Sequence, residues 1–324
     1  MHWGSGFSAL FLMAIAWSFS PVSDAHATDL NDVLREDAPG IGGSQASVST
    51  QNPDAALAVV AQKYQGAVGL VTGIGAKGKR IPIGTAWAVG PSRFVTNAHV
   101  TESVKKILEA GIDVYVLLNR SRTAKLKVIS FSQHPKYDEI RVKKTGAKAF
   151  GNTYDVAFIE VAGKTDTYFP VAHEKELRSI TPGYRVAYLG FPMEGLANGN
   201  VDVSNPLATM QSGIVSSMSD YYFGDSGFKN NVIIRHNLPL SGGASGSPLF
   251  NVRGEVIGVI SAGNMSRSIE IDAKTKDVRL GRTPSAAMVN FAQRIDLVHE
   301  IPGFRAPQSR PATSKGAGDK GFKW

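Results

Sequence analysis

The chain has 324 residues, of which 43% are hydrophobic and 19% charged, with no cysteine and a formal net charge of +8. This length can hold two small domains or one large all-β domain, and the lack of cysteine excludes disulfides, thiol nucleophiles and cysteine-based metal sites. Residues 305–324 contain five basic residues and one aspartate, so they supply +4 of the excess charge. We interpret residues 304–324 as a disordered basic tail, and no basic helix indicates binding of nucleic acid.

The first 27 residues predict a secretory signal peptide. They contain no Lys or Arg, an almost uninterrupted apolar run from Phe7 to Phe19, and the sequence Ala25-His26-Ala27 before Thr28. This order is typical of a leader that is cleaved after the second alanine. The alternative, an uncleaved anchor, would need a longer apolar run. We expect an exported protein, periplasmic or secreted, without stable membrane insertion.

Residues 28–51 are polar and rich in Gly and Ser, which indicates a linker or a pro-segment. Ordered structure is expected from Asn52, because Asn is a favoured helix N-cap and Pro53 suits the first helical position. We therefore predict a short helix over Asp54–Tyr64.

The rest of the chain is dominated by short runs rich in Val, Ile and aromatic residues, separated by turn residues, which predict about twelve strands. A helical turn, Glu102–Glu109, follows the third strand, and Gly163–Pro182 connects two halves of similar size. Such regular spacing favours an all-β fold of antiparallel barrels or sandwiches over βαβ units. The expected strands are Ala67–Thr72, Ile83–Val89, Phe94–Thr96, Asp113–Leu118, Leu126–Ser130, Val156–Val161, Tyr184–Gly190, Thr209–Ser217, Val232–Arg235, Ser247–Phe250, Val256–Ser261 and Ala287–Ala292.

Three local patterns could carry chemistry. His99 stands at the exit of a strand in GTAWAVGPSRFVTNAHV, and an imidazole can accept and return a proton near neutral pH. Asp155 enters the apolar strand of TYDVAFIEV, where a buried carboxylate needs a hydrogen-bond donor such as the His99 ring. Taken singly, His99 could be a structural residue and Asp155 a turn or cap residue.

A serine nucleophile has two candidates. Ser245 lies in GGASGSPLF, where Gly243 and Gly246 permit a tight turn with backbone N–H groups aimed at a developing oxyanion. Ser226 lies in GDSG, but Gly227-Phe228-Lys229 follows it without a hairpin, so nothing builds an oxyanion site there. We predict that Ser226 is a loop residue and that Ser245 is the nucleophile.

Together these residues resemble the trypsin-like (chymotrypsin-fold) serine peptidases, in particular the bacterial branch of Deg/HtrA proteases and glutamyl endopeptidases. The resemblance runs from about Asn52 to Glu300 and rests on three patterns in the family's order: Thr96-Asn97-Ala98-His99-Val100, Asp155-Val156-Ala157-Phe158 and Gly243-Ala244-Ser245-Gly246-Ser247-Pro248. It implies two six-stranded antiparallel β-barrels, about 64–165 and 180–295 within a peptidase domain of 52–303, with the active site in the cleft between them.

The resemblance also implies a role for each residue. Ser245 would attack the scissile carbonyl, His99 would carry the proton and Asp155 would orient the ring, while the N–H groups of Gly243 and Ser245 form the oxyanion hole. Ser261 would hydrogen-bond Asp155 from behind, and the backbone of Ser261, Ala262 and Gly263 would pair with an extended polypeptide substrate. No cofactor is implied.

Two departures limit the transfer. Trypsin has an Asp before its nucleophile that pairs with the new N-terminus on activation, whereas Ala244 stands here, so that salt bridge is not expected. No PDZ domain is expected after Glu300 either. Because the segment from His236 to Ser241 holds no carboxylate, we expect a small to medium apolar P1 residue rather than Lys or Arg. His236, an ordinary strand-end residue in the simpler interpretation, could instead receive an acidic P1 residue, as could Arg294.

Two competing functions remain at this point. The chain could keep the peptidase fold as a binding module without turnover. It could also be an α/β-hydrolase esterase, but that fold requires Gly-x-Ser-x-Gly and the chain order Ser, Asp, His. A metal site is not expected, since the remaining histidines of the mature chain, His134, His173 and His299, lie on separate segments without a carboxylate cluster.

Overall fold

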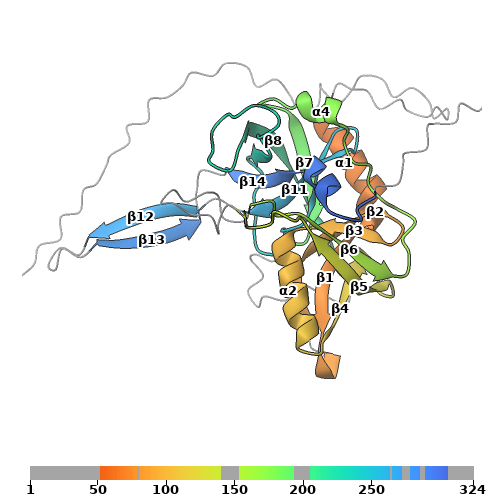
Figure 1. Cartoon of the computed structure of the whole chain (residues 1–324). Helices are drawn as coiled ribbons and strands as arrows, with labels where there is room; N and C mark the ends of the chain where they lie inside the picture. Colours follow the sequence, from red (N-terminus) through yellow and green to blue (C-terminus); the bar gives the residue numbers. More distant parts are fainter. Residues whose placement is uncertain are drawn as a thin grey trace, which may run out of the picture. The chain divides into compact units, whose positions relative to one another are not determined.

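The computed structural model of the chain describes residues 52–78, 80–139, 153–192, 205–262, 265–271, 278–284 and 289–305, with the backbone alone in the strands 265–271 and 278–284. The described part contains two closed antiparallel barrels of six strands each, drawn in Figure 1. This architecture confirms the expected fold. The predicted signal peptide and linker, and the tail from residue 306, lie outside the described residues.

The first element, α1 (Pro53–Tyr64), begins one residue before the predicted range Asp54–Tyr64 and ends at the predicted residue. Asn52 is the N-cap, and its side-chain oxygen accepts hydrogen bonds from the backbone N–H groups of Asp54 and Ala55 at 3.1 and 3.2 Å. Pro53 occupies the first helical position, where its missing N–H costs nothing. Leu57 and Val60 are buried, so the helix packs one face onto the protein.

Barrel one follows α1 and a 3₁₀ turn. Its strands close in the order β1-β2-β3-β6-β5-β4, and the helix α2 (Ala98–Glu109) leaves the end of β3. Its strands are β1 (Val68–Ile74), β2 (Arg80–Gly90), β3 (Arg93–Thr96), β4 (Asp113–Leu118), β5 (Lys125–Gln133) and β6 (Ala157–Ala162).

Barrel two closes in the order β10-β11-β14-β9-β8-β7. A short helix, α4 (Glu174–Arg178), precedes it in the connection between the barrels, where the sequence indicated no helix. Its strands are β7 (Arg185–Gly190), β8 (Thr209–Ser219), β9 (Ile233–His236), β10 (Pro248–Asn251), β11 (Val256–Ala262) and β14 (Asn290–Arg294), and a 3₁₀ helix (Ile295–Glu300) follows β14.

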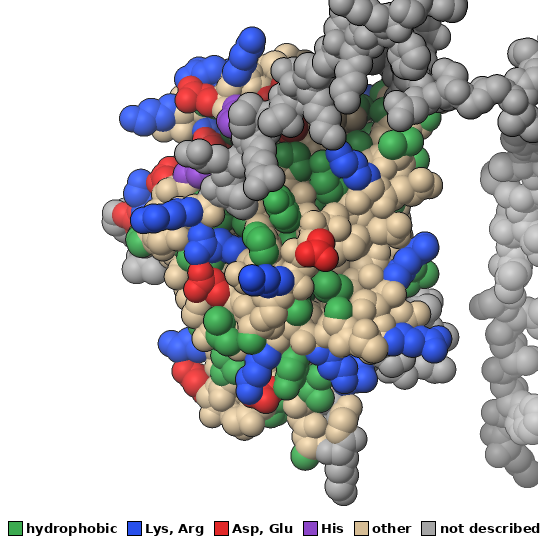
Figure 2. Space-filling model, turned by 90° about the vertical axis from the view of Figure 1, so that its right-hand side faces the viewer, with side chains coloured by type: hydrophobic (Ala, Val, Ile, Leu, Met, Phe, Trp, Pro, Cys, Tyr) green, Lys and Arg blue, Asp and Glu red, His purple; other side chains and the backbone are tan. Residues whose placement is uncertain are grey.

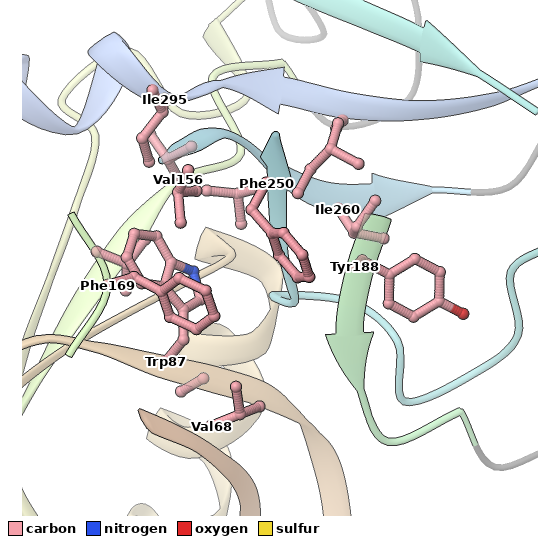
Figure 3. Packing of buried hydrophobic residues seen from close by; sticks show 14 of the residues in the cluster. Val68, Trp87, Val156, Phe169, Tyr188, Phe250, Ile260 and Ile295 are labelled. Atoms are coloured by element: carbon pink, nitrogen blue, oxygen red, sulfur yellow. The ribbon is translucent and has the colours of Figure 1, made fainter. Parts of the chain in front are cut away.

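The connection between the barrels carries an aromatic side chain that joins their cores. Phe169 packs edge-on against Trp87 of β2, with ring centroids 5.9 Å apart, and against Phe250 of β10 at 5.6 Å. Figure 3 shows the Phe169 and Trp87 rings side by side, with Phe250 next to them. All three side chains are almost completely buried, so burial of apolar area holds one barrel against the other.

Two elements differ from the sequence prediction. The helix α2 begins at Ala98 rather than Glu102, so His99 lies inside its first turn. A further hairpin, β12 (Met265–Ile271) and β13 (Val278–Pro284), occupies a segment where no strand was predicted. Both strands mix charged and polar residues with apolar ones and form a two-stranded sheet of their own.

The surface charge is dispersed on the face drawn in Figure 2. Lys and Arg side chains lie there among acidic and apolar ones and do not gather into one basic patch. None of the helices in the described part of the chain is long and apolar enough to cross a membrane.

Candidate active site

The histidine and the aspartate meet where β3 passes into α2. Asn97, the residue before the helix, is buried and donates from its side-chain amide to the backbone carbonyl of Asp155 at 2.8 Å. His99 is the second residue of α2, and Asp155 lies in the turn before β6, the neighbour of β3 in the barrel. Adjacent strands therefore bring together two residues that are 56 positions apart.

The Asp155 carboxylate contacts His99 through both of its oxygens. Asp155 Oδ2 lies 2.7 Å from His99 Nδ1, and Oδ1 accepts the backbone N–H of His99 at 2.9 Å. The Asp155 side chain is fully buried, while that of His99 is 28% exposed. A carboxylate held in this way keeps a proton on Nδ1, so Nε2 of the neutral ring is free to accept one.

The electrostatic surroundings favour the protonated form of His99. Burial by itself lowers the pKa of the ring, but the charge of Asp155 and its hydrogen bond to the ring, with a smaller contribution from Glu102, outweigh that effect. The pKa of His99 therefore lies above its ordinary value.

Ser245 lies in a turn of barrel two that is fastened to barrel one. Its carbonyl oxygen accepts the backbone N–H of Thr85, a β2 residue, at 2.8 Å. The Thr85 hydroxyl donates to the carbonyl of Gly243 at 2.8 Å and accepts the N–H of Phe191 at 3.1 Å. Thr85 is buried, so these bonds fix the turn between two parts of the protein without competition from water.

Within this turn, the pattern of backbone hydrogen bonds leaves two donors available. Ala244 N–H donates to the Ser241 carbonyl at 3.1 Å, and Gly246 N–H donates to the Ile260 carbonyl at 2.8 Å. In the part of the chain that the structure describes, the N–H groups of Gly243 and Ser245 have no acceptor. Such a pair can receive a developing oxyanion.

Gly246 is required by both its backbone conformation and its surroundings. Its φ is +89°, and a Cβ atom there would stand 2.0 Å from the Thr85 carbonyl oxygen and 2.4 Å from Thr96 Oγ1. We expect Gly246→Ala to lower the free energy of unfolding by about 2 to 4 kcal/mol, measured by urea denaturation. Gly242→Ala is the matched control, because nothing lies within 4 Å of a Cβ there. Equal stability of the two variants would contradict the close approach of the turn to β2.

The structure also brings the Ser245 turn to the start of α2. A Cβ on Gly84 would lie 3.1 Å from the Ser245 carbonyl oxygen and 2.9 Å from Val100 Cγ2, so Gly84 separates Ser245 from the residue after His99. Among the hydrogen bonds of the described residues, none joins the Ser245 hydroxyl to the His99 ring. In unliganded hydrolases this bond is often long and shortens when substrate binds.

Ser226 lies in the loop between β8 and β9. Its hydroxyl donates to Asp220 Oδ2 at 2.6 Å, and its N–H donates to Asn231 Oδ1 at 2.9 Å. The residue is exposed. Ser226 is thus a loop residue, as the sequence predicts.

The expected hydrogen bond from Ser261 to Asp155 is absent. The Ser261 hydroxyl is buried and finds no hydrogen-bond partner among the described residues. Ser261 lies at a register shift of β11 between Ile260 and Ala262, a bulge in its pairing with β14, and a bulge can redirect a side chain. Of the segment expected to pair with substrate, Ser261 and the backbone of Ala262 are described, and Gly263 lies outside the described residues.

His236 and Arg294, which could have received an acidic substrate side chain, are engaged inside the protein. His236 is completely buried, and this burial, opposed only in part by the Phe291 backbone, lowers the pKa of the ring to about 3. The ring is therefore neutral at physiological pH. Arg294 is also buried and donates to both carboxylate oxygens of Asp296, at 2.7 and 2.8 Å.

Sequence reasoning did not identify two residues that hold the site. Thr85 anchors the Ser245 turn through its bond to the Gly243 carbonyl. Tyr221 lies outside the three sequence patterns, but its hydroxyl accepts the N–H of Tyr154, the neighbour of Asp155, at 2.6 Å. Thr85 stands in the same segment as His99, but a threonine in an apolar strand does not indicate a distant partner. Across the described residues, no three His, Asp or Glu side chains are grouped so as to hold a metal ion.

Comparison with known proteins adds the family. Residues 84–259 match the trypsin-like peptidase domain, and these residues include His99, Asp155 and Ser245. No protein with a curated description matches the chain.

Among solved structures, the chain is similar to the Rv3671c protease in its inactive form, with 19% identity, a TM-score of 0.44, and coverage of 76% of this chain and 94% of the other. A Ser343Ala mutant of Rv3671c from M. tuberculosis H37Rv, also an inactive form, matches at 18% identity and a TM-score of 0.44, covering 76% of this chain and 91% of the other.

Proposed function

Because this chain belongs to the trypsin-like peptidase family, we propose that it is a serine endopeptidase with Ser245, His99 and Asp155 as its catalytic residues. The observation that carries the proposal is the two-point contact of the buried Asp155 carboxylate with His99. Such a contact selects the one ring tautomer that can accept a proton from a serine.

The proposed reaction begins at the Ser245 hydroxyl. Its oxygen attacks the carbonyl carbon of the scissile peptide while its proton passes to His99 Nε2, and the carbonyl electron pair moves to oxygen. His99 then gives the proton to the leaving amine, which leaves an acyl ester on Ser245. Water attacks the ester in the second half of the reaction, His99 again takes the proton, and the acid product leaves as Ser245 recovers its hydrogen.

Asp155 has the same role in both halves of the proposed reaction, formation of the acyl ester and its hydrolysis. The imidazolium formed on proton transfer carries a positive charge, and the carboxylate 2.7 Å from Nδ1 stabilises it. The N–H groups of Gly243 and Ser245 would donate to the oxyanion, and each such donor contributes about 10² to 10³ in rate. Thr85 supports this turn through its bond to the Gly243 carbonyl.

For specificity we propose an apolar P1 residue of small to medium size. The segment from His236 to Ser241 holds no carboxylate, Leu238 is fully buried, and His236 is neutral. Arg294 is neutralised by Asp296. None of these side chains therefore offers a free charge to an acidic P1 residue, and digestion of a peptide library with mass-spectrometric identification of the products would test the preference.

We further propose that the protein is exported, on the strength of the apolar N-terminal run. Sequencing of the N-terminus of the protein recovered from the periplasm or the medium should show a start near Thr28.

The proposed activity is tested with a serine-directed fluorophosphonate. We expect the purified mature protein to be labelled at Ser245, located by peptide mapping, and the label to disappear in His99→Ala because the hydroxyl then lacks its base. Labelling at Ser226, or no labelling at any serine, would overturn the proposal.

Activity should depend on pH through His99. The ring must be neutral to act as a base, and the charge of Asp155 raises its pKa above the ordinary value of about 6.5. We therefore expect kcat/KM to fall as the pH drops, with a midpoint above about 6.5. A pH profile with an apolar peptide substrate measures this midpoint. A midpoint below the ordinary value would show that burial, rather than the charge of Asp155, determines the pKa of the His99 ring.

A further inference from the structure

The residue before Asp155 has an unusual backbone conformation. Tyr154 has a φ of +52°, in the left-handed region that a bulky side chain rarely adopts. Its carbonyl accepts the N–H of Val156 at 2.9 Å, so the chain makes a tight turn around Asp155. Such a conformation persists only where the surrounding structure holds it.

The group that holds it comes from the other barrel. Tyr154 N–H donates to the hydroxyl of Tyr221 at 2.6 Å, and Tyr221 follows the end of β8 in barrel two. The same hydroxyl donates to Gln293 Oε1 of β14 at 2.8 Å. Because the hydroxyl hydrogen is directed at Gln293, its lone pair is directed at Tyr154, and the side chain of Tyr221 is almost fully buried.

Ring contacts add to these hydrogen bonds. The Tyr154 ring contacts two others: the His134 ring, stacked at a centroid distance of 4.9 Å, and the Tyr221 ring, also at 4.9 Å but tilted by 58°. The backbone N–H of His134 donates to the Val156 carbonyl at 3.0 Å. Both neighbours of Asp155 are thus held, and Asn97 holds the Asp155 carbonyl itself.

From this arrangement we propose that Tyr221 is a positioning residue of barrel two: through the Tyr154 N–H, it fixes the turn that aims the Asp155 carboxylate at His99. The inference rests on the proposed peptidase function. It makes the alignment of Asp155 with His99, both in barrel one, depend on the Tyr221 hydroxyl of barrel two. Asp155 and His99 would therefore be aligned only when the two barrels are packed against each other.

The test removes the hydroxyl and keeps the ring. We expect Tyr221→Phe to react with a fluorophosphonate at Ser245 about tenfold to a hundredfold more slowly than wild type, since small misplacements of catalytic groups have effects of this size. The acid limb of the labelling rate should also move to lower pH, because a misaligned Asp155 raises the pKa of His99 less. Gln293→Met, which removes the acceptor of the Tyr221 hydroxyl, should shift the limb in the same direction by less.

The matched control is Tyr184→Phe, which removes a half-buried hydroxyl bonded to Glu176 and Asn251, none of which contacts the three proposed catalytic residues in the hydrogen bonds of the described chain. It should leave the midpoint unchanged. A Tyr221→Phe protein with the wild-type rate and midpoint would overturn the proposal. So would a loss of labelled fraction without a shift in the midpoint, which is the result expected of a purely structural role.

A second readout is independent of reactivity. An NMR titration of the His99 ring in Ser245→Ala protein should give a lower pKa when Tyr221→Phe is added. If this shift occurs but wild type is not labelled, the peptidase proposal fails while the positioning of Asp155 stands. If wild type is labelled and the shift is missing, the positioning proposal alone fails.

Discussion

Ser245→Ala is expected to lower kcat for peptide hydrolysis by about 10⁶-fold, because removal of a serine nucleophile abolishes the acyl-enzyme route. The loss should occur without a change in stability, since the side chain is only partly buried and the turn is held by backbone groups of Gly243 and Ser245. Hydrolysis of a peptide identified by library digestion gives kcat, and thermal denaturation gives the stability.

The control for this variant is Ser226→Ala, which changes the serine of the other glycine-flanked motif. It removes a hydrogen bond to Asp220 in an exposed loop and should retain wild-type kcat. The double variant Ser245→Ala with His99→Ala should be no less active than Ser245→Ala alone, because residues that act as a unit do not add. Residual hydrolysis by Ser245→Ala near the wild-type rate would exclude Ser245 as the nucleophile.

Asp155→Asn should reduce kcat by about 10⁴-fold while the fold is retained. The Asn amide would donate to His99 Nδ1, which places the ring hydrogen on Nε2 and leaves no acceptor for the proton of Ser245. The charge that raises the pKa of His99 is lost as well, so the acid limb of the remaining activity should move to lower pH. Steady-state kinetics across the acid range measure both effects.

Asp113→Asn is the control for the loss of one carboxylate. Asp113 forms an exposed ion pair with Lys127 at 2.8 Å, and its loss should change neither kcat nor the pH profile. An Asp155→Asn protein that kept the wild-type rate would show that His99 does not depend on this carboxylate.

The sequence predicted the three proposed catalytic residues because each stands in a pattern only a few residues long. The turn around Ser245 needs glycine at 243 and 246, where φ is +91° and +89°, and such a requirement is visible in the residues themselves. The strands of the barrels were predicted for the same reason, since an apolar run between turn residues is a local property.

The remaining features depend on partners that are distant in sequence. Thr85 is 158 residues from Gly243, and Tyr154 is 67 residues from Tyr221. A single threonine or tyrosine carries no sign of which backbone group it will meet. The burial of His236 between β8 and β14 is likewise a product of strand pairing, and that burial makes a titratable side chain neutral.

The hairpin β12–β13 and the bulge at Ser261 were missed for a related reason. The strands β12 and β13 of the hairpin contain Arg, Glu, Ser and Gly among few apolar residues, so they show no continuous apolar run. A bulge is one unpaired residue in a ladder, and the pairing of β11 with β14 decides where it falls.

The double use of Thr85 limits how this protein can move. One side chain of the first barrel is bonded both to the loop of the nucleophile candidate and to the residue that follows β7. Any hinge motion that swung the halves apart would break these bonds together and dismantle the arrangement needed for chemistry. We therefore expect a polypeptide substrate of the proposed peptidase to bind without separation of the two barrels, and crosslinks that hold the barrels together should leave the proposed turnover intact.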